Sequence, residues 1–247
     1  MKQLKIMTYN IQHGHVHLSK KPGDEIDLTK VGDVIRESGA EIIGLNEVRG
    51  PGEHPDYTAQ AEFLGNYLGY NAYFGRAIFF DGKNPYGNAI LSKYPIIETK
   101  VIPIPDPYNA KELKGYFEPR CIVRAVIEMP GGKRIAVYSS HFGLNPEEAE
   151  HAVTTAVTVL REEALPFVLM GDFNLTPDSP ILAPLYANLT LTDDLIPEAE
   201  KLTFPSDDPK IKIDYIFAGN GAVPVSAGVK QIVAADHCPV WADVELR

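Results

Sequence analysis

Several residues that could bind a metal ion or move a proton lie at the ends of apolar segments of the sequence. The set comprises Asn10, Glu47, His141, Asp172, Asn174, Asp236 and His237, together with Asp214 inside a further apolar run. Carboxylates, amides and imidazoles without a cysteine cluster suit a hard cation such as Mg²⁺ or Mn²⁺. Loops at strand ends are where α/β folds place chemistry, so the sequence predicts a metal-assisted active site there.

Taken singly, each of these residues also has a structural explanation. An asparagine such as Asn10 often forms a turn, Glu47 could cap a following helix, and Asp172 in GDFN could be a turn aspartate. His141 or His237 alone is commonly a hydrogen-bonded structural imidazole. The functional interpretation therefore depends on the whole series occurring in one order.

The elements that must position these residues are strands alternating with a few helices. Apolar runs predict strands over 5–10, 41–48, 70–80, 87–91, 96–104, 121–129, 134–141, 167–171, 213–217 and 240–246. Helical spacing predicts helices over 27–38, 58–68 and 146–163, the second with Ala61, Phe63, Leu64 and Leu68 inward. The segments 13–25, 50–57, 80–86 and 105–119 are expected to rim the site.

Consecutive strands in the middle of the chain imply antiparallel pairing in addition to βαβ units. We therefore predict a four-layer α/β sandwich, in which two mixed β-sheets pack face to face with helices outside. The chain of 247 residues is expected to form one domain over 1–247.

Composition narrows the possible functions. Hydrophobic residues make up 45% and charged residues 23%, as in ordinary globular proteins. No apolar run reaches the roughly 20 residues of a membrane span, and the first ten residues do not resemble a signal peptide, so a cytoplasmic location is expected. The net charge of −10 and the lack of a Lys/Arg stripe argue against a protein that grips long nucleic acid. An acidic enzyme can still act on a phosphate when a metal ion supplies positive charge.

Seven segments, taken in order, resemble the signature blocks of the endonuclease/exonuclease/phosphatase superfamily. They are TYNI, NEV, GNAILS, SSHF, GDFN, KIDYIF and ADHCPV, and they extend from Thr8 to Val240. The superfamily includes apurinic endonucleases, pancreatic deoxyribonuclease, neutral sphingomyelinases, inositol polyphosphate 5-phosphatases and deadenylases. The resemblance implies a Mg²⁺-dependent phosphohydrolase, with Mn²⁺ as an alternative ion, that cleaves a phosphate ester by in-line attack of an activated water.

The resemblance also implies a role for each matching residue on the metal side of the site. Glu47 should bind the catalytic metal, Asn10 should lie beside the metal and the scissile phosphate, and Asp236 should lie on the metal side. Two positions depart from the pattern of relatives. Asn46 stands where many have glutamine, and Gln12 stands where apurinic endonucleases have an aspartate.

The remaining roles concern water and phosphate. Asp172 should orient or deprotonate the attacking water, and Asn174 should hold a phosphate oxygen. His237 should contact the phosphate and be oriented by Asp214. His141, where other members carry tyrosine, should also touch the phosphate.

Arg120, in EPRC, could clamp a phosphate or form a surface salt bridge.

Three further features have competing interpretations. Strand alternation places Asp214 on the face opposite Ile213 and Tyr215, where its partner could be His237 or Lys212. The histidines of HGHVH, from His13 to His17, could suggest zinc, but the segment has no fourth ligand, and substrate contact or a solvated loop is the preferred interpretation. Cys238, beside His237, could be a nucleophile, although a metal-water mechanism already accounts for its neighbours.

The substrate class follows from charge and size. We favour a small molecule, a sugar phosphate or a lipid head group as the phosphate ester, with a nuclease acting on DNA or RNA as the alternative. A catalytically idle binding module on the same fold is disfavoured, because no expected catalytic position is lost.

Overall fold

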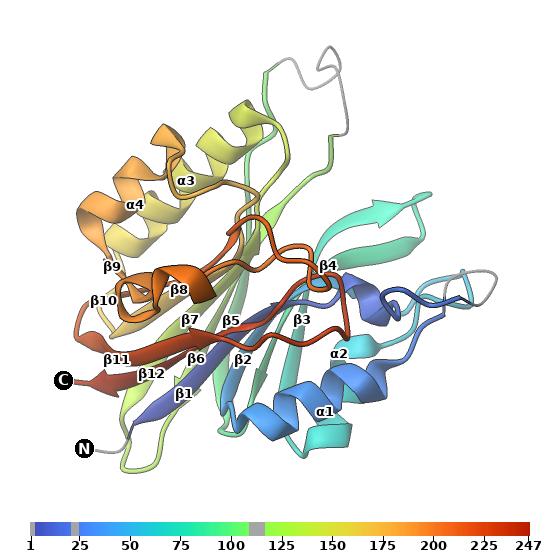
Figure 1. Cartoon of the computed structure of the whole chain (residues 1–247), viewed down its shortest axis with the longest axis horizontal. Coiled ribbons are helices and arrows are strands. Elements are labelled where there is room, and N and C mark those ends of the chain that lie inside the picture. The colour runs from blue at the N-terminus through green and yellow to red at the C-terminus, as the bar shows by residue number, and fades with distance from the viewer. Residues whose placement is uncertain (1–2, 21–24, 109–116) are drawn as a thin grey trace.

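Two mixed six-stranded sheets pack face to face in the computed structural model, which describes residues 3–20, 25–108 and 117–247 (Figure 1). The predicted loops 13–25 and 105–119 therefore include residues 21–24 and 109–116 that lie outside the described residues. One sheet has the order β11-β12-β1-β2-β4-β3 and the other β5-β6-β7-β8-β10-β9. The strands of the first sheet are β1 (Leu4–Asn10), β2 (Ile42–Arg49), β3 (Asn71–Phe80), β4 (Asn84–Ser92), β11 (Ala222–Val229) and β12 (Val240–Leu246). Those of the second are β5 (Ile96–Pro103), β6 (Cys121–Glu128), β7 (Arg134–His141), β8 (Phe167–Asp172), β9 (Thr190–Leu191) and β10 (Asp214–Gly219).

Four helices cover the outer faces of the sheets, which confirms the predicted four-layer sandwich. α1 (Leu28–Ser38) and α2 (Gln60–Leu68) pack on the first sheet, and α3 (Pro146–Arg161) and α4 (Ala183–Asn188) pack on the second (Figure 1). Each sheet contains one parallel pair, β1 with β2 and β7 with β8, and its other pairs are antiparallel. Among the described residues, none of the helices combines the length and the apolar character that crossing a membrane requires.

The core between the sheets consists of alternate residues on the inner face of each strand. Ile6 and Ile42 of the first sheet lie in one apolar cluster with Val123, Val137 and Met170 of the second. Strand alternation produces this layer, since residues two apart share a face. In β10, Ile216 belongs to this inner cluster while Tyr215 and Phe217 lie in the cluster under α3, so Asp214 has the predicted parity.

Local signals set the ends of the long helices. The Asp27 side chain accepts the backbone N–H of Thr29 at 3.0 Å and so caps α1, which ends at Gly39 with a φ of 70°. Asn145 and Glu148 form a reciprocal capping box at the start of α3. These contacts are local in the chain, which is why both helices were predictable.

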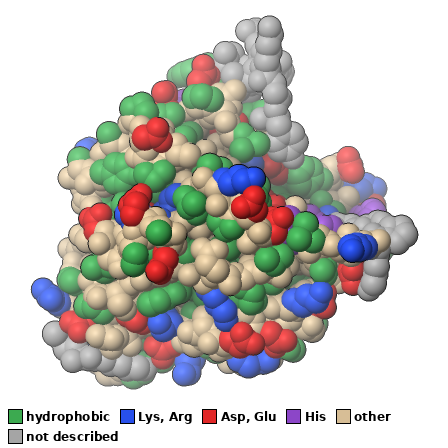
Figure 2. All heavy atoms as spheres, in the orientation of Figure 1, with side chains coloured by type: hydrophobic (Ala, Val, Ile, Leu, Met, Phe, Trp, Pro, Cys, Tyr) green, Lys and Arg blue, Asp and Glu red, His purple; other side chains and the backbone are tan. Residues whose placement is uncertain are grey.

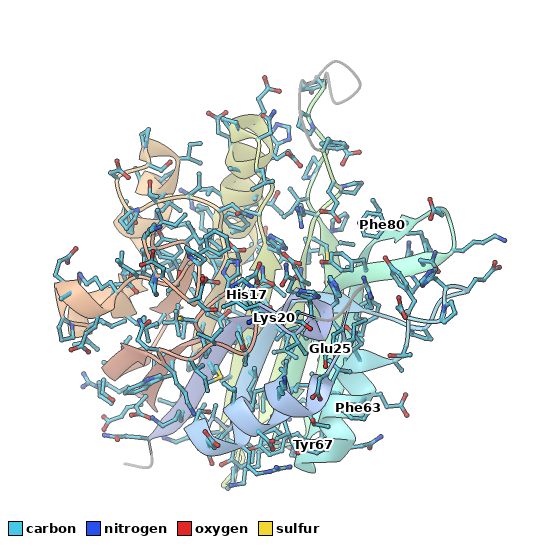
Figure 3. All side chains as sticks on the ribbon, turned by 45° about the vertical axis from the view of Figure 1, so that its right-hand side comes forward. His17, Lys20, Glu25, Phe63, Tyr67 and Phe80 are labelled. Carbon is cyan, nitrogen blue, oxygen red and sulfur yellow. The ribbon has the colours of Figure 1, made fainter. Side chains whose placement is uncertain are left out.

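Several features of the fold differ from the prediction, and neither α4 nor β9 was predicted. β11 was not predicted, because Pro224 lies in it. Its register with β12 also shifts between Pro224 and Ser226, and both features are typical of an edge strand. Phe63 was predicted to face inward but is 44% exposed, since the buried stripe of α2 follows Ala61, Leu64 and Gly65. Its ring instead stacks on Tyr67 one turn later, with centroids 6.1 Å apart, and both side chains lie on α2 in Figure 3.

Candidate active site

The ends of the two sheets meet at a cleft of about 670 Å³. β1 and β2 run parallel, as do β7 and β8, so each pair delivers its last residues to one edge of its sheet. β10 is antiparallel to β8 and begins there, with Asp214 paired to Asp172. Predicted residues lining the cleft are Glu47, Arg120, His141, Asp172, Asn174, Asp236 and His237. Asn10 and Asp214 are buried directly behind them, so the structure brings the whole predicted series together.

Asp172 is held at the end of β8 by a close approach of two backbones. Gly171 has a φ of 150°, and a Cβ on it would lie 1.7 Å from the carbonyl oxygen of Ser140, so only glycine fits before the aspartate. Asp172 Oδ1 accepts the backbone N–H of Asn174 at 2.9 Å, and its Oδ2 accepts from Asn10 Nδ2 at 3.0 Å. Both carboxylate oxygens are therefore oriented by neutral donors.

Glu47 reaches the site through a bulge in β2. The strand continues to Arg49 instead of ending at Glu47, and its register with β4 shifts between Leu45 and Val48. Glu47 takes a φ of 59°, which is uncommon for a side-chain-bearing residue and re-aims its carboxylate. Asn10 Nδ2 donates to Oε1 at 3.0 Å, and the Tyr86 hydroxyl donates to Oε2 at 2.7 Å.

The oxygen donors near Glu47 fit a hard divalent cation. Asp236 Oδ1 is buried and has no hydrogen-bond partner among the described residues. Burial raises the pKa of Asp236, although nearby His237 lowers it, and the negative charge of Glu47 raises it further. A cation between the carboxylates of Glu47 and Asp236 would offset both the burial of Asp236 and the repulsion between the two negative charges. Mg²⁺ commonly uses only one or two carboxylates beside water.

The side chain of Asn10 connects other residues of the site by hydrogen bonds. Its amide nitrogen bridges Glu47 and Asp172, while its Oδ1 accepts the backbone N–H of Gln12 at 3.1 Å. Through Asn10, the carboxylates of Glu47 and Asp172 share one donor.

His237 and Asp214 form a buried dyad. His237 Nδ1 lies 2.9 Å from Asp214 Oδ2, and the two side chains are 5% and 1% exposed. The alternative partner, Lys212, instead contacts Asp193 Oδ2 at 3.0 Å and donates to the backbone carbonyl of Asp214. Atoms of Asp172, Asp214 and His237 also lie within 4.8 Å of one another and could hold a metal ion. Because His237 Nδ1 is already bonded to Asp214, we interpret this group as a hydrogen-bonded dyad facing a third acid.

Asp172 and His237 lie next to each other in the cleft, and the pKa of each is strongly shifted. Burial raises the pKa of Asp172 to about 7; the positive charge of His237 lowers it and the negative charge of Asp214 raises it. Burial alone would lower the pKa of His237, but the Asp214 and Asp172 carboxylates outweigh it and raise that pKa to about 10. His237 Nε2 lies 3.6 Å from Asp172 Oδ2. Near neutral pH the site thus holds a cationic imidazole beside a carboxylate that can exchange a proton.

His141 also lies beside Asp172, with its Nε2 3.5 Å from Asp172 Oδ2. Its Nδ1 lies 3.0 Å from Arg120 Nη1, and its Nε2 lies 3.0 Å from Asn174 Nδ2. The pKa of His141 is held well below its usual value by burial and by the positive charges of Arg120 and His237. Arg120 does not form a surface salt bridge, because it pairs with the buried Glu118 at 2.8 Å and points into the cleft.

Sequence reasoning missed several residues that organise this site. Asn46 Oδ1 accepts the backbone N–H of Asp172 at 3.0 Å, and its Nδ2 donates to Asn88 Oδ1 at 2.9 Å, so Asn46 links β2 to β8 across the sandwich. Tyr86 and Glu118 also line the cleft. Asn46 lies inside a matched block, Tyr86 lies beside one and Glu118 is two residues before Arg120, but no local pattern shows which partner each one finds.

Of the other candidates from the sequence, His13 also lines the cleft. His17 Nε2 lies 3.0 Å from Asp207, and the rings of His13 and His15 are 6.4 Å apart. Figure 3 shows His17 on the segment between β1 and α1, which approaches this end of the sheets. Cys238 is buried, and burial raises the pKa of its thiol, which disfavours the thiolate that a nucleophile requires.

Replacing Lys212 by alanine should destabilise the protein by about 3–5 kcal/mol, because Asp193 would be left as a buried, unpaired charge. Lys212 and Asp193 are only 3% and 4% exposed. Urea unfolding followed by circular dichroism measures the difference. Lys210→Ala is the control, since Lys210 is 69% exposed two residues earlier. The Lys212→Met/Asp193→Leu double variant should recover most of the loss; equal stability of Lys212→Ala and wild type would contradict the burial argument.

Comparisons with known proteins bear on the family and the fold of the chain. The Endonuclease/Exonuclease/phosphatase family model matches residues 7–237. No curated protein matches the chain. Several solved structures share its fold. An endonuclease/exonuclease/phosphatase from Beutenbergia cavernae has a TM-score of 0.79 at 23% identity and covers 100% of this chain and 72% of its own. One from Bacteroides vulgatus has a TM-score of 0.78 at 20% identity, covering 100% of both chains. A mannosyl-6-phosphatase from Bacteroides thetaiotaomicron has a TM-score of 0.78 at 16% identity, covering 98% of this chain and 100% of its own.

Proposed function

The chain belongs to the endonuclease/exonuclease/phosphatase family, and from that premise we propose that it is a magnesium-dependent hydrolase of small phosphate esters. Mn²⁺ is the alternative ion. Glu47 and Asp236 would hold the ion, with Asn10 beside them. When bound, it would neutralise charge on the phosphate and stabilise the leaving oxygen.

The observation that carries the proposal is the opposed pair of Asp172 and His237. A carboxylate with a pKa of about 7 and an imidazole with a pKa of about 10 lie within one cleft, 3.6 Å apart at their nearest oxygen and nitrogen. Environments that push the pKa values of two titratable groups apart give the groups different roles in acid–base chemistry. Asp172 is matched to accept a proton from water near neutral pH, and His237 is matched to remain a cation beside an anionic phosphate.

The surrounding donors suit a phosphate group. His237 carries a proton on Nε2 because its Nδ1–H donates to Asp214, and Asn174 presents Nδ2 beside His141. Arg120 adds a fixed guanidinium. These N–H groups are held by the fold before substrate arrives, and such preorganised donors stabilise charge that develops during in-line attack.

A small substrate is supported by the size and walls of the cleft. Its volume of about 670 Å³ lies in the range of small-molecule sites, and Tyr57, Phe80 and Leu144 line it beside the charged residues. Lys and Arg side chains on the face drawn in Figure 2 are scattered among Asp and Glu, without a basic stripe among the residues described there. A sugar phosphate fits these properties, in keeping with the mannosyl-6-phosphatase among the structural neighbours. A lipid head group is the other small class that the cleft would admit.

A substrate panel tests the proposal. With Mg²⁺ present, kcat/KM would be measured for mannose 6-phosphate, p-nitrophenyl phosphate, bis-p-nitrophenyl phosphate and sphingomyelin, alongside nicking of plasmid DNA and cleavage of single-stranded RNA. We expect one of the small esters to be the best substrate. Faster cleavage of DNA or RNA would make the protein a nuclease, and no turnover of any substrate would indicate a binding module.

Asp214→Asn should shift the alkaline side of the pH–rate profile to lower pH. The pKa of His237 is raised to about 10 by Asp214 and Asp172, so its cation is present below that pH and lost above it. Removing the Asp214 charge lowers this pKa, and the loss of activity should begin earlier. Asp208→Asn, 70% exposed, is the control and should keep the wild-type profile. If Asp214→Asn loses rate without any shift of the alkaline limb, His237 is not the group that titrates there.

A further inference from the structure

Glu118, Arg120 and His141 form a continuous chain of buried contacts beside the cleft. Arg120 Nη2 lies 2.8 Å from Glu118 Oε2, and Arg120 Nη1 lies 3.0 Å from His141 Nδ1. The side chains of Arg120, Glu118 and His141 are 9%, 6% and 8% exposed. Charged groups are seldom buried this deeply unless they are paired. One end of the guanidinium is thus anchored by a carboxylate, while its other end faces an imidazole.

The contact with Arg120 decides where His141 can carry its proton. A guanidinium has only donors, so His141 Nδ1 must accept from it. Burial and two neighbouring positive charges hold the pKa of His141 well below its usual value, so the ring is neutral near pH 7. A neutral imidazole has one N–H, which must then be on Nε2.

Asn174 would favour the opposite arrangement. Its Nδ2 donates to the carbonyl of Phe142 at 3.0 Å and also lies 3.0 Å from His141 Nε2. An Nδ1–H tautomer would let Nε2 accept from Asn174, but it would set an N–H against the guanidinium of Arg120. Hydrogen bonds with an ionised partner are roughly twice as strong as neutral ones, so Arg120 prevails over Asn174. The Nε2–H of His141 and an N–H of Asn174 then converge, and a phosphate oxygen could accept both.

From this geometry we infer that Glu118 is a positioning residue that acts through Arg120 to keep His141 in its Nε2–H form. His141 then serves as a neutral hydrogen-bond donor to the substrate and does not deliver a proton as a general acid. The use of the N–H rests on the proposed phosphate-ester hydrolysis. The tautomer itself is a property of the free protein, so the tautomer assignment and the proposed hydrolysis can be disproved separately.

Nitrogen NMR of the free wild-type protein tests the tautomer without any substrate. With ¹⁵N-labelled histidine, His141 assigned by loss of its signals in His141→Ala should show a pyrrole-like shift at Nε2 and a pyridine-like shift at Nδ1 between pH 6 and 8. A protonated Nδ1 in the wild-type protein would overturn the inference. In Glu118→Gln, Arg120 loses its anchor, and we expect intermediate shifts from a mixture of tautomers. Glu128→Gln, which removes an exposed partner of Arg134, should leave the His141 signals unchanged.

Kinetics separate positioning from folding. Glu118→Gln should lower kcat by about 10–100-fold with KM little changed, by analogy with the loss of an outer partner of a metal-binding histidine. In a His141→Ala background the same substitution should have almost no further effect, because Glu118 and Arg120 then have no imidazole to position. If the two substitutions each cause their full loss independently, Glu118 does not act through His141, and the inference is overturned. If no substrate is turned over, the proposed function fails, and the NMR result still decides the tautomer.

Discussion

Asp172→Asn should lower kcat by about 10²–10⁴-fold, the range expected when a general base is lost. Asp172 is 1% exposed, and its Oδ2 lies within 3.6 Å of both the His237 and His141 Nε2 atoms. Asparagine keeps the shape of the side chain but cannot take a proton from water. Because burial raises the pKa of Asp172 to about 7, the wild-type rate should fall on the acid side near that pH. The variant should have lost this acid limb together with its activity.

The control for this variant makes the same chemical change nearby. Asp178→Asn alters an exposed aspartate six residues later, which accepts from the hydroxyl of Thr176. It should retain wild-type kcat. Steady-state kinetics from pH 5 to 10 and a thermal melt of each protein complete the comparison. If Asp172→Asn unfolds at a lower temperature but keeps its specific activity, Asp172 is a structural turn residue.

Removing divalent metal should abolish turnover, and Mg²⁺ or Mn²⁺ should restore it. The observation behind this prediction is that Glu47 and Asp236 line the same cleft, where burial and the charge of Glu47 raise the pKa of Asp236. Glu47→Gln keeps the donors Asn10 and Tyr86 close by but removes one negative charge, so metal affinity should fall by about 10–100-fold. Excess metal should then rescue part of the activity.

Mn²⁺ binding can be followed directly by electron paramagnetic resonance, which does not depend on turnover. Glu53→Gln is the matched control, because Glu53 is 66% exposed and pairs only with Lys83 among the described residues. It should bind Mn²⁺ like the wild type. Full activity in chelator would remove the metal from the mechanism. Equal Mn²⁺ affinity of Glu47→Gln and wild type would remove Glu47 from the ligand set.

The sequence by itself determined most of the elements and the order of the polar residues at their ends. Helix α1 was predictable because its apolar spacing, its cap at Asp27 and its end at Gly39 are all within one short segment. The parity of Asp214 was predictable for the same reason, since side chains alternate along any strand. The ordered blocks from Thr8 to Val240 also contain every predicted site residue except Arg120.

Only the tertiary structure decided which of these residues are partners. Lys212 and His237 were both possible partners for Asp214, and the packing of the loop before β12 placed His237 within 2.9 Å while Asp193 took Lys212. The bulge that turns Glu47 inward depends on pairing with β4, and Arg120 contacts His141 only because β6 and β7 are neighbours. Distances and burial between residues far apart in sequence are set by how the two sheets pack, and it is those quantities that raise the pKa of Asp172 and fix the charge of His237.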